Sequence, residues 1–211
     1  MMLRRILSLV ASVGIGLPAI ADTRVVDGDT LEHNGTVYRL NGIDAPEHDQ
    51  TCGAWRCGPA ATQALVDMVK GHDIQCDAIS KDGYGRVIAT CYANGADIGG
   101  SLVDKGLAWA FVKYSDAYVV EENSARAQGL GIWAGVFTAP WDLRAKRWQQ
   151  AQATAPAGCP IKGNISNRGR IYHTPWSPWY ERTGINTKAG ERWFCSEAEA
   201  LEAGWRAPYW N

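Results

Sequence analysis

Three short stretches of the chain contain the residues that could do chemistry: Asp27–Thr30, Arg39–Glu47 and Tyr84–Arg86. The first two include Asp29 and Asp44, which could offer carboxylate oxygens to a hard divalent cation. Ca²⁺ takes about six to eight oxygen ligands, so backbone carbonyls and water would complete such a site. We therefore expect a cation where these two stretches meet.

The same stretches contain positive charges and a base. Arg39 and Arg86 could hold a phosphate between two planar guanidinium groups, which match phosphate oxygens in pairs. Glu47 could deprotonate a water molecule directed at that phosphate. A metal ion, cations and a base are the components needed to cleave a phosphodiester bond.

Taken singly, each stretch is ordinary. Asp-Gly-Asp-Thr is common as a surface turn, and Pro46 forces Ala45 into an extended conformation that could simply end a strand. Arg39 is less ordinary, because a half-buried guanidinium in the middle of a strand needs an anionic partner. His48 beside Glu47 could act as a base or ligand, but we expect a solvated or paired loop side chain.

Short strands and helices must position these residues. Runs rich in β-branched and aromatic residues predict strands, and Asn34-Gly35 predicts a hairpin turn between two of them. Pro59 suits the first position of a helix that Gly71 closes. The predicted strands are 23–26, 30–33, 36–40 and 87–92, and the predicted helices are 59–70, 98–105 and 121–130. This order suggests a small β-barrel with packed helices.

The six cysteines indicate disulfides if the chain is exported. Cys76 and Cys91 flank the turn at 81–86, so a hairpin would place them opposite each other. Cys52 and Cys57 share one loop; either could instead pair with Cys76 or Cys91. A Zn²⁺ site on Cys52 and Cys57 would lack a second closely spaced pair. Cys159 and Cys195 remain, far down the chain.

Residues 1–21 have the order of a secretory signal. Arg4 and Arg5 precede the uncharged run 6–21, which ends in Ala-Ile-Ala. The alternative, a membrane anchor, is disfavoured because the run is short and contains two glycines and a proline. We expect cleavage after Ala21, no membrane span afterwards, and a secreted or periplasmic protein.

Composition limits the class of protein and suggests two units. The chain has 211 residues, is 46% hydrophobic and has a formal net charge of −1. This excludes a disordered chain and a basic duplex-coating protein, so any nucleic acid must bind at a local site. The small polar stretch 149–158 is typical of a linker between a domain at 22–148 and a module at 159–211.

The C-terminal module holds five of the ten tryptophans. They could form a surface for stacking or carbohydrate contact. The favoured interpretation is that a tiny domain uses tryptophan as its core and a Cys159–Cys195 bridge as a staple. A capping box at Ser196–Glu199 predicts a short helix, which Gly204 would end.

Taken together and in their order along the chain, the motifs are specific enough to indicate a protein family. V-V-D-G-D-T-L, Y-R-L-N-G-I-D-A-P-E, D-G-Y-G-R, G-L-A-W and G-L-G-I-W follow one another between Arg24 and Trp133. This order resembles the thermonuclease (staphylococcal-nuclease-like) family, and the C-terminal piece resembles the sunset module of some secreted bacterial nucleases. The resemblance implies an α+β fold, with a five-stranded OB-fold-like β-barrel, three packed helices and a small disulfide-stapled C-terminal α/β module. It also implies Ca²⁺-dependent hydrolysis of DNA and RNA.

Site roles follow from the resemblance, position by position. They are Asp29, Asp44 and the Ala45 carbonyl as Ca²⁺ ligands, Arg39 and Arg86 on the phosphate, Glu47 as catalytic glutamate, and Tyr84 and Tyr114 along the nucleotide pocket. Ala45 and Gly83 stand where the best-known member has threonine and lysine. Substrate affinity and the preference between DNA and RNA therefore stay open.

The expected protein is an exported, monomeric Ca²⁺-dependent nuclease without a stable protein partner. Two other classes remain open. One is a catalytically silent nucleic-acid-binding module on the same barrel, which the presence of Arg39, Glu47 and Arg86 disfavours. The other is a cell-envelope adhesion protein that acts through its C-terminal module.

Overall fold

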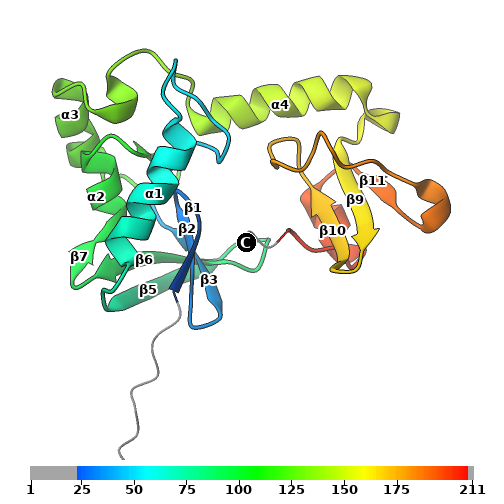
Figure 1. Cartoon of the computed structure of the whole chain (residues 1–211), viewed down its shortest axis with the longest axis horizontal. Coiled ribbons are helices and arrows are strands. Elements are labelled where there is room, and N and C mark those ends of the chain that lie inside the picture. The colour runs from blue at the N-terminus through cyan, green and yellow to red at the C-terminus, as the bar shows by residue number, and fades with distance from the viewer. Residues whose placement is uncertain (1–22, 209–211) are drawn as a thin grey trace, which may run out of the picture.

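The computed structural model describes residues 23–208, so the expected signal at 1–21 lies outside the described residues. Two units are joined by one long helix, α4 (Pro140–Thr154), which runs from the first unit to the second (Figure 1). Helices and a mixed sheet make up the first unit, which confirms the expected α+β class. In the part of the chain that is described, no helix is long and apolar enough to cross a membrane.

The main sheet follows the path β1-β2-β3-β6-β5, with β7 added on β6. Its neighbours are antiparallel except β3 and β6, which run parallel. The predicted Asn34-Gly35 turn joins β2 to β3. The strands are β1 Thr23–Asp27, β2 Thr30–His33, β3 Thr36–Leu40, β5 Ile74–Lys81, β6 Val87–Ala93 and β7 Ala96–Asp97. This is the five-stranded path of the expected OB-fold-like barrel.

A second, two-stranded ladder pairs β4 (Ile43–Asp44) with β8 (Trp109–Ala110). Three helices close the barrel core: α1 Cys57–Val69, α2 Ile98–Asp104 and α3 Val119–Ala127. The predicted stripe of α1 is buried, and Leu65 packs with Leu31 in one cluster, both fully buried. Burying each such side chain contributes about 1.5–3 kcal/mol. Helix α1 begins two residues before Pro59, and α3 ends before the predicted residue 130.

Part of the expected linker is helical, because residues 149–154 are the last turns of α4, the helix that joins the two units. The helix has no apolar stripe of its own; one tryptophan near its start and another near its middle fix it. Trp141 packs against the cluster that contains Trp109 and the Cys52–Cys57 disulfide, and Trp148 packs against the core of the second unit. Tertiary contacts rather than local sequence thus hold this helix.

The C-terminal module is a three-stranded sheet in the order β10-β9-β11 followed by a short helix. Its buried core contains Phe194 and Trp205, which supports the interpretation of tryptophan as core, although Trp193 is only partly buried. The elements are β9 Ile161–Ser166, β10 Gly169–His173, β11 Arg192–Phe194 and α5 Glu197–Glu202. Short 3-10 turns are η1 Gly131–Trp133, η2 Pro156–Gly158 and η3 Thr187–Ala189.

Three disulfides are formed. Cys76 lies directly opposite Cys91 in the β5–β6 ladder, as the hairpin predicted. The bridge between Cys52 and Cys57 excludes both a Zn²⁺ site there and a bond from that loop to the hairpin. Cys159–Cys195 ties the start of the module to the residue that follows its last strand.

Candidate active site

Asp29 lies in the tight turn between β1 and β2, facing the end of β4. The Ala45 N–H donates to Asp29 Oδ2 at 3.1 Å, and the Thr30 hydroxyl donates to Oδ1 at 3.0 Å. A Cβ on Gly28 would lie 2.7 Å from the Ala45 Cβ, so a larger residue would push the two stretches apart. The turn therefore depends on glycine to bring its carboxylate to Ala45.

Arg39 on β3 links the two expected cation ligands. Its Nη1 pairs with Asp29 Oδ1, and its Nη2 lies 3.1 Å from Oδ1 of the buried Asp44. These carboxylates are the anionic partners that the mid-strand guanidinium needs. Burial raises the pKa of Asp29, but the charge of Arg39 and the Ala45 N–H outweigh it and hold the pKa below its usual range. Burial and the charge of Asp29 raise the pKa of neighbouring Asp27 to about 8.

Arg144 on α4 completes this cluster, and sequence reasoning missed it. Its Nη2 lies 2.6 Å from Asp44 Oδ2, and its Nη1 lies 2.5 Å from Glu47 Oε1 and 3.2 Å from Asp44 Oδ1. One guanidinium therefore binds both acids. Pro140, at the start of the helix, was the available signal that a helix begins there.

Three parts of the chain hold the loop that carries Glu47: the Gln50 side chain, the segment before α4 and the start of α1. Its N–H donates to Gln50 Oε1 at 3.0 Å, and Gln50 Nε2 donates to the Thr138 carbonyl at 2.7 Å. A Cβ on Gly58 would lie 1.9 Å from the Glu47 carbonyl oxygen, so α1 starts in direct contact with this loop. Burial raises the pKa of Glu47 to about 7 against the lowering effect of Arg144. A carboxylate with that pKa suits a general base near neutral pH.

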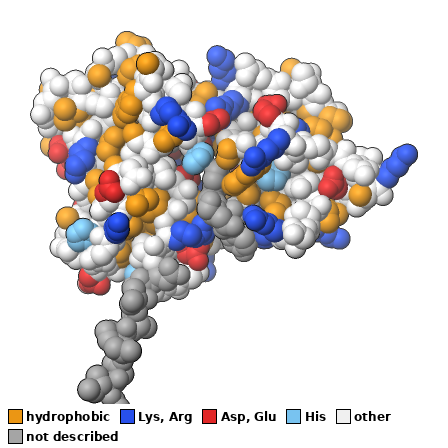
Figure 2. Space-filling model, in the orientation of Figure 1, with side chains coloured by type: hydrophobic (Ala, Val, Ile, Leu, Met, Phe, Trp, Pro, Cys, Tyr) orange, Lys and Arg blue, Asp and Glu red, His pale blue; other side chains and the backbone are white. Residues whose placement is uncertain are grey.

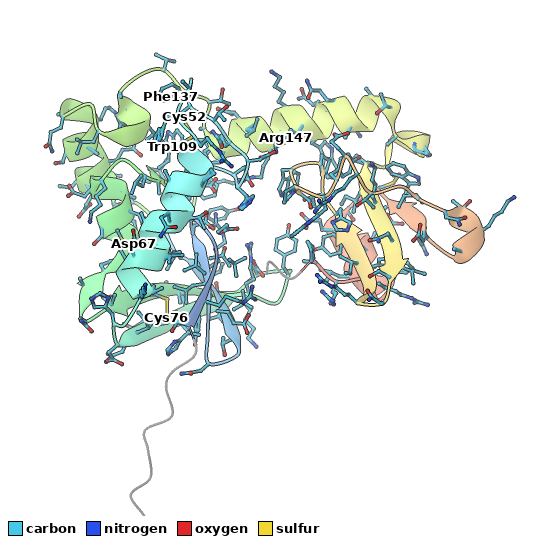
Figure 3. All side chains as sticks on the ribbon, in the orientation of Figure 1. Cys52, Asp67, Cys76, Trp109, Phe137 and Arg147 are labelled. Carbon is cyan, nitrogen blue, oxygen red and sulfur yellow. A yellow bond between two sulfur atoms is a disulfide. The ribbon has the colours of Figure 1, made fainter. Side chains whose placement is uncertain are left out.

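The start of α4 is anchored by an aromatic cluster. Figure 3 shows Cys52, Trp109 and Phe137 together where α4 begins, with Arg147 further along the helix. The Trp141 ring stacks on Phe111, with centroids 5.4 Å apart. Arg147 makes two 3.0 Å hydrogen bonds to Asp49. This packing directs Arg144 at Glu47 and clamps the Glu47 loop.

The other predicted site residues lie on separate loops. Arg86 Nε pairs with Asp82 Oδ2 at 2.7 Å, within the hairpin, rather than with Asp29 or Asp44. Its charge still contributes to lowering the pKa of Asp29. Tyr84 lies beside it, with the Arg86 guanidinium 5.2 Å from the ring centroid. Tyr114 is exposed, and its ring contacts Phe111.

The structure therefore brings together five predicted residues: Asp29, Arg39, Asp44, Ala45 and Glu47. Asp29 and Asp44, together with the Ala45 carbonyl, would supply an all-oxygen donor set, which suits a hard cation such as Ca²⁺. Asp29 Oδ2 accepts one N–H and keeps further acceptor capacity. Within residues 23–208 no three His, Cys, Asp or Glu side chains converge as a metal site, so backbone and water would supply the other ligands. Both oxygens of Asp44 accept from guanidinium groups, so a cation would compete with Arg144 for Oδ2.

Comparisons with known proteins agree on the first unit. A family model described as "Staphylococcal nuclease homologue" matches residues 37–135, and one named ArfC matches residues 146–207. The expected sunset resemblance of the module is not confirmed by that second match.

Three individual relatives are similar to this chain, and two of them have nuclease names. An "Uncharacterized endonuclease" from Escherichia coli is 33% identical over 132 residues, which cover 59% of this chain and 83% of that protein. "Succinoglycan biosynthesis protein ExoI" of Rhizobium meliloti (strain 1021) is 34% identical over 57% of this chain and 67% of its own length. "Staphylococcal-like nuclease CAN1" of Arabidopsis thaliana is 34% identical over 50% of this chain and 32% of its own length.

Proposed function

The chain belongs to the staphylococcal nuclease homologue family and is a nuclease, and from that membership we propose that it is a Ca²⁺-dependent enzyme that hydrolyses DNA, RNA or both. Its nuclease domain spans residues 22–148 and its accessory module residues 159–211. The observation that carries the proposal is the bridge that Arg39 makes between Asp29 and Asp44, beside Glu47 and its partner Arg144.

In the proposed mechanism Glu47 accepts a proton from water as the water oxygen bonds to phosphorus. The phosphorus–oxygen bond to the leaving 5′ oxygen breaks, and this oxygen takes a proton from solvent water. The products are a 3′-phosphate and a free 5′-hydroxyl, and Glu47 then releases its proton to solvent. Asp29, Asp44 and the Ala45 carbonyl would hold Ca²⁺, which when bound supplies positive charge to the phosphate oxygens. Arg39 and Arg86 would stabilise the charge that develops on the same phosphate.

Substrate contacts would come from the loops around this cluster. Tyr84 and Tyr114 offer rings on which bases could stack, an interaction that every base can make. Figure 2 shows Lys and Arg side chains near the junction of the two units on the visible face. Local basic side chains of this kind support nucleic-acid binding in a chain whose net charge is only −1.

We also propose an exported, monomeric protein. Three disulfides within one chain of this size favour an oxidising compartment such as the periplasm or the cell exterior. The expected signal at 1–21 agrees with export.

Digestion of supercoiled plasmid and of single-stranded RNA with Ca²⁺, with EGTA and with Zn²⁺ tests the function. We expect cleavage with Ca²⁺ only, because an all-oxygen site suits Ca²⁺ better than Zn²⁺. Full activity in EGTA would contradict the metal assignment. Tight binding without cleavage would favour the silent binding module, and neither binding nor cleavage would favour adhesion through the C-terminal module.

A further inference from the structure

The guanidinium of Arg144 pairs with both Asp44 and Glu47, and Arg144 lies outside the segment that the family model matches. The family match ends at residue 135, whereas Arg144 lies on α4. Its guanidinium makes hydrogen bonds of 2.5, 2.6 and 3.2 Å to three oxygens of the two acids. Asp44 is almost fully buried, with 1% of its side chain exposed.

This contact is built into the fold rather than made by a loose surface side chain. Trp141, three residues earlier, packs between Phe111 and Trp109, with centroid distances of 5.4 and 6.2 Å. One turn later, Arg147 pairs with Asp49 on the same loop as Glu47. The helix is thus fixed on both sides of Arg144, so the guanidinium has little freedom to leave by moving the backbone.

A cation at Asp44 must compete with this guanidinium. Both bind carboxylate oxygens, and both are positive, so at a separation of a few ångströms they repel each other. Asp44 Oδ2 bonds Arg144 and Oδ1 already accepts from Arg39 and Arg144. Glu47, in contrast, gives Arg144 a partner that is not an expected cation ligand.

We propose that Arg144 is the internal counter-cation of this site: it neutralises Asp44 until Ca²⁺ binds, then gives up Asp44 while it keeps its bond to Glu47. This inference rests on the metal site of the proposed function. Arg144 is then a positioning residue for Glu47, and its release from Asp44 is an energetic cost of every Ca²⁺ binding event. Because Ca²⁺ has to displace Arg144 from Asp44, Arg144 lowers the Ca²⁺ affinity of the protein.

Isothermal titration of the full chain with Ca²⁺, without nucleic acid, tests the proposal directly. Arg144→Gln should bind Ca²⁺ at least about tenfold more tightly than the unmodified protein, equivalent to about 1.4 kcal/mol. Lys146→Gln is the matched control: it removes a positive charge from an exposed position of the same helix, away from the contacts that fix Arg144, and its Ca²⁺ affinity should change less than about twofold. Unchanged or weaker binding by folded Arg144→Gln would overturn the proposal, as would an equal gain in the control.

A second variant covers the case in which Arg144→Gln does not fold. Arg144→Lys keeps the charge but loses the planar fork that spans both acids. It should bind Ca²⁺ more tightly than the unmodified protein; equal or weaker binding would overturn the proposal. If no Ca²⁺ binding is measurable in the unmodified protein, binding by either variant supports the proposal, and its absence in both refutes it.

The outcome is separable from that of the proposed function. A protein that binds Ca²⁺ with the expected variant effect but cleaves neither DNA nor RNA retains the role of Arg144 and loses the proposed activity. A protein that cleaves with Ca²⁺ but shows no gain in affinity in the variants retains the activity and loses this role.

Discussion

The hydroxyl of Tyr84 donates a 2.7 Å hydrogen bond to Oε1 of Glu197, which joins the β5–β6 hairpin to the C-terminal module. Tyr84 precedes Arg86 by two residues, and Glu197 is the first residue of α5. Burial, the charge of Glu197 and this hydrogen bond raise the pKa of the Tyr84 hydroxyl. The module therefore contacts the nuclease unit at a residue expected to line the nucleotide pocket.

Removing this contact should loosen the hairpin. In Glu197→Ala we expect faster amide hydrogen exchange over residues 82–86, because the hydroxyl loses its charged acceptor. Exchange mass spectrometry of the full chain measures this. Glu202→Ala, at the exposed end of the same helix, is the control and should leave exchange in the hairpin unchanged. Equal amide exchange rates over residues 82–86 in Glu197→Ala and the unmodified protein would show that the contact does not stabilise the hairpin.

Glu47→Gln tests the base. The variant keeps the shape of the side chain but cannot accept the proton of water, so kcat should fall by roughly 10²–10⁴-fold. Steady-state cleavage of a fluorescent oligonucleotide at saturating Ca²⁺ measures this, with circular dichroism to confirm folding. The control is Glu202→Gln, the same chemical change at an exposed position of α5, which should leave kcat unchanged. Near-normal turnover in Glu47→Gln would assign the base elsewhere.

Local patterns were sufficient to predict four strands of the main sheet, the hairpin that joins β5 to β6, and most of the acidic cluster. The Asn34-Gly35 turn and the β-branched runs determine strand pairing over short distances, and the Cys76–Cys91 pairing follows from the hairpin. Arg39 and its acids meet because Asp29 directly precedes Thr30, the residue opposite Arg39 on β2, and Asp44 follows Arg39 by only five residues.

Helix α4 and Arg144 could not be predicted in this way. The partners of Arg144 lie 100 and 97 residues earlier in the chain, and α4 buries little of its own surface. From the sequence alone such a segment looks like a polar linker, because the helix is stabilised by its tertiary contacts. Similarly, Arg86 pairs with Asp82 inside its own hairpin. The prediction that Arg39 and Arg86 hold a phosphate did not include this contact.

The Cys76–Cys91 disulfide should contribute substantially to stability. Its sequence separation is 15, and a loop of that size corresponds to about 3 kcal/mol in the chain-entropy model. Domains are typically stable by only about 5–15 kcal/mol, so Cys76→Ala with Cys91→Ala should lower the urea midpoint clearly. Activity should fall as well, because the hairpin carries Tyr84 and Arg86.

Two further measurements complete this test. Non-reduced tryptic peptides should contain Cys76 joined to Cys91. Replacing Cys159 and Cys195 by alanine should destabilise the module and leave the midpoint of the nuclease unit close to its original value. An unchanged midpoint after removal of Cys76–Cys91 would show that the barrel core alone is sufficient.

His173 should make the C-terminal module sensitive to acid. The ring is buried at the end of β10, where Nε2 lies 3.1 Å from Asn164 Oδ1 and Nδ1 lies 3.3 Å from Ser177 Oγ. Burial, and then the charges of Lys162 and Arg182, lower its pKa to about 4. An unfolded chain takes up this proton near pH 6.5. Between these values the unfolded state binds the proton that the folded state excludes, so the free energy of unfolding falls as pH drops from about 6.5 to about 4.

The lowered pKa of His173 corresponds to at most about 3 kcal/mol of folding stability. This contribution is fully present above about pH 6.5 and is lost progressively as the pH falls below that value. Urea unfolding followed by tryptophan fluorescence at pH 7.0, 6.0, 5.0 and 4.5 should show this loss in the unmodified protein. His173→Gln removes the titrating ring, so its stability should depend less steeply on pH, although it is lower at pH 7 because the packing is disturbed. His72→Gln, at an exposed position, should keep the slope of the unmodified protein. Equal slopes in all three proteins would mean that carboxylates, rather than His173, determine the acid sensitivity of the module.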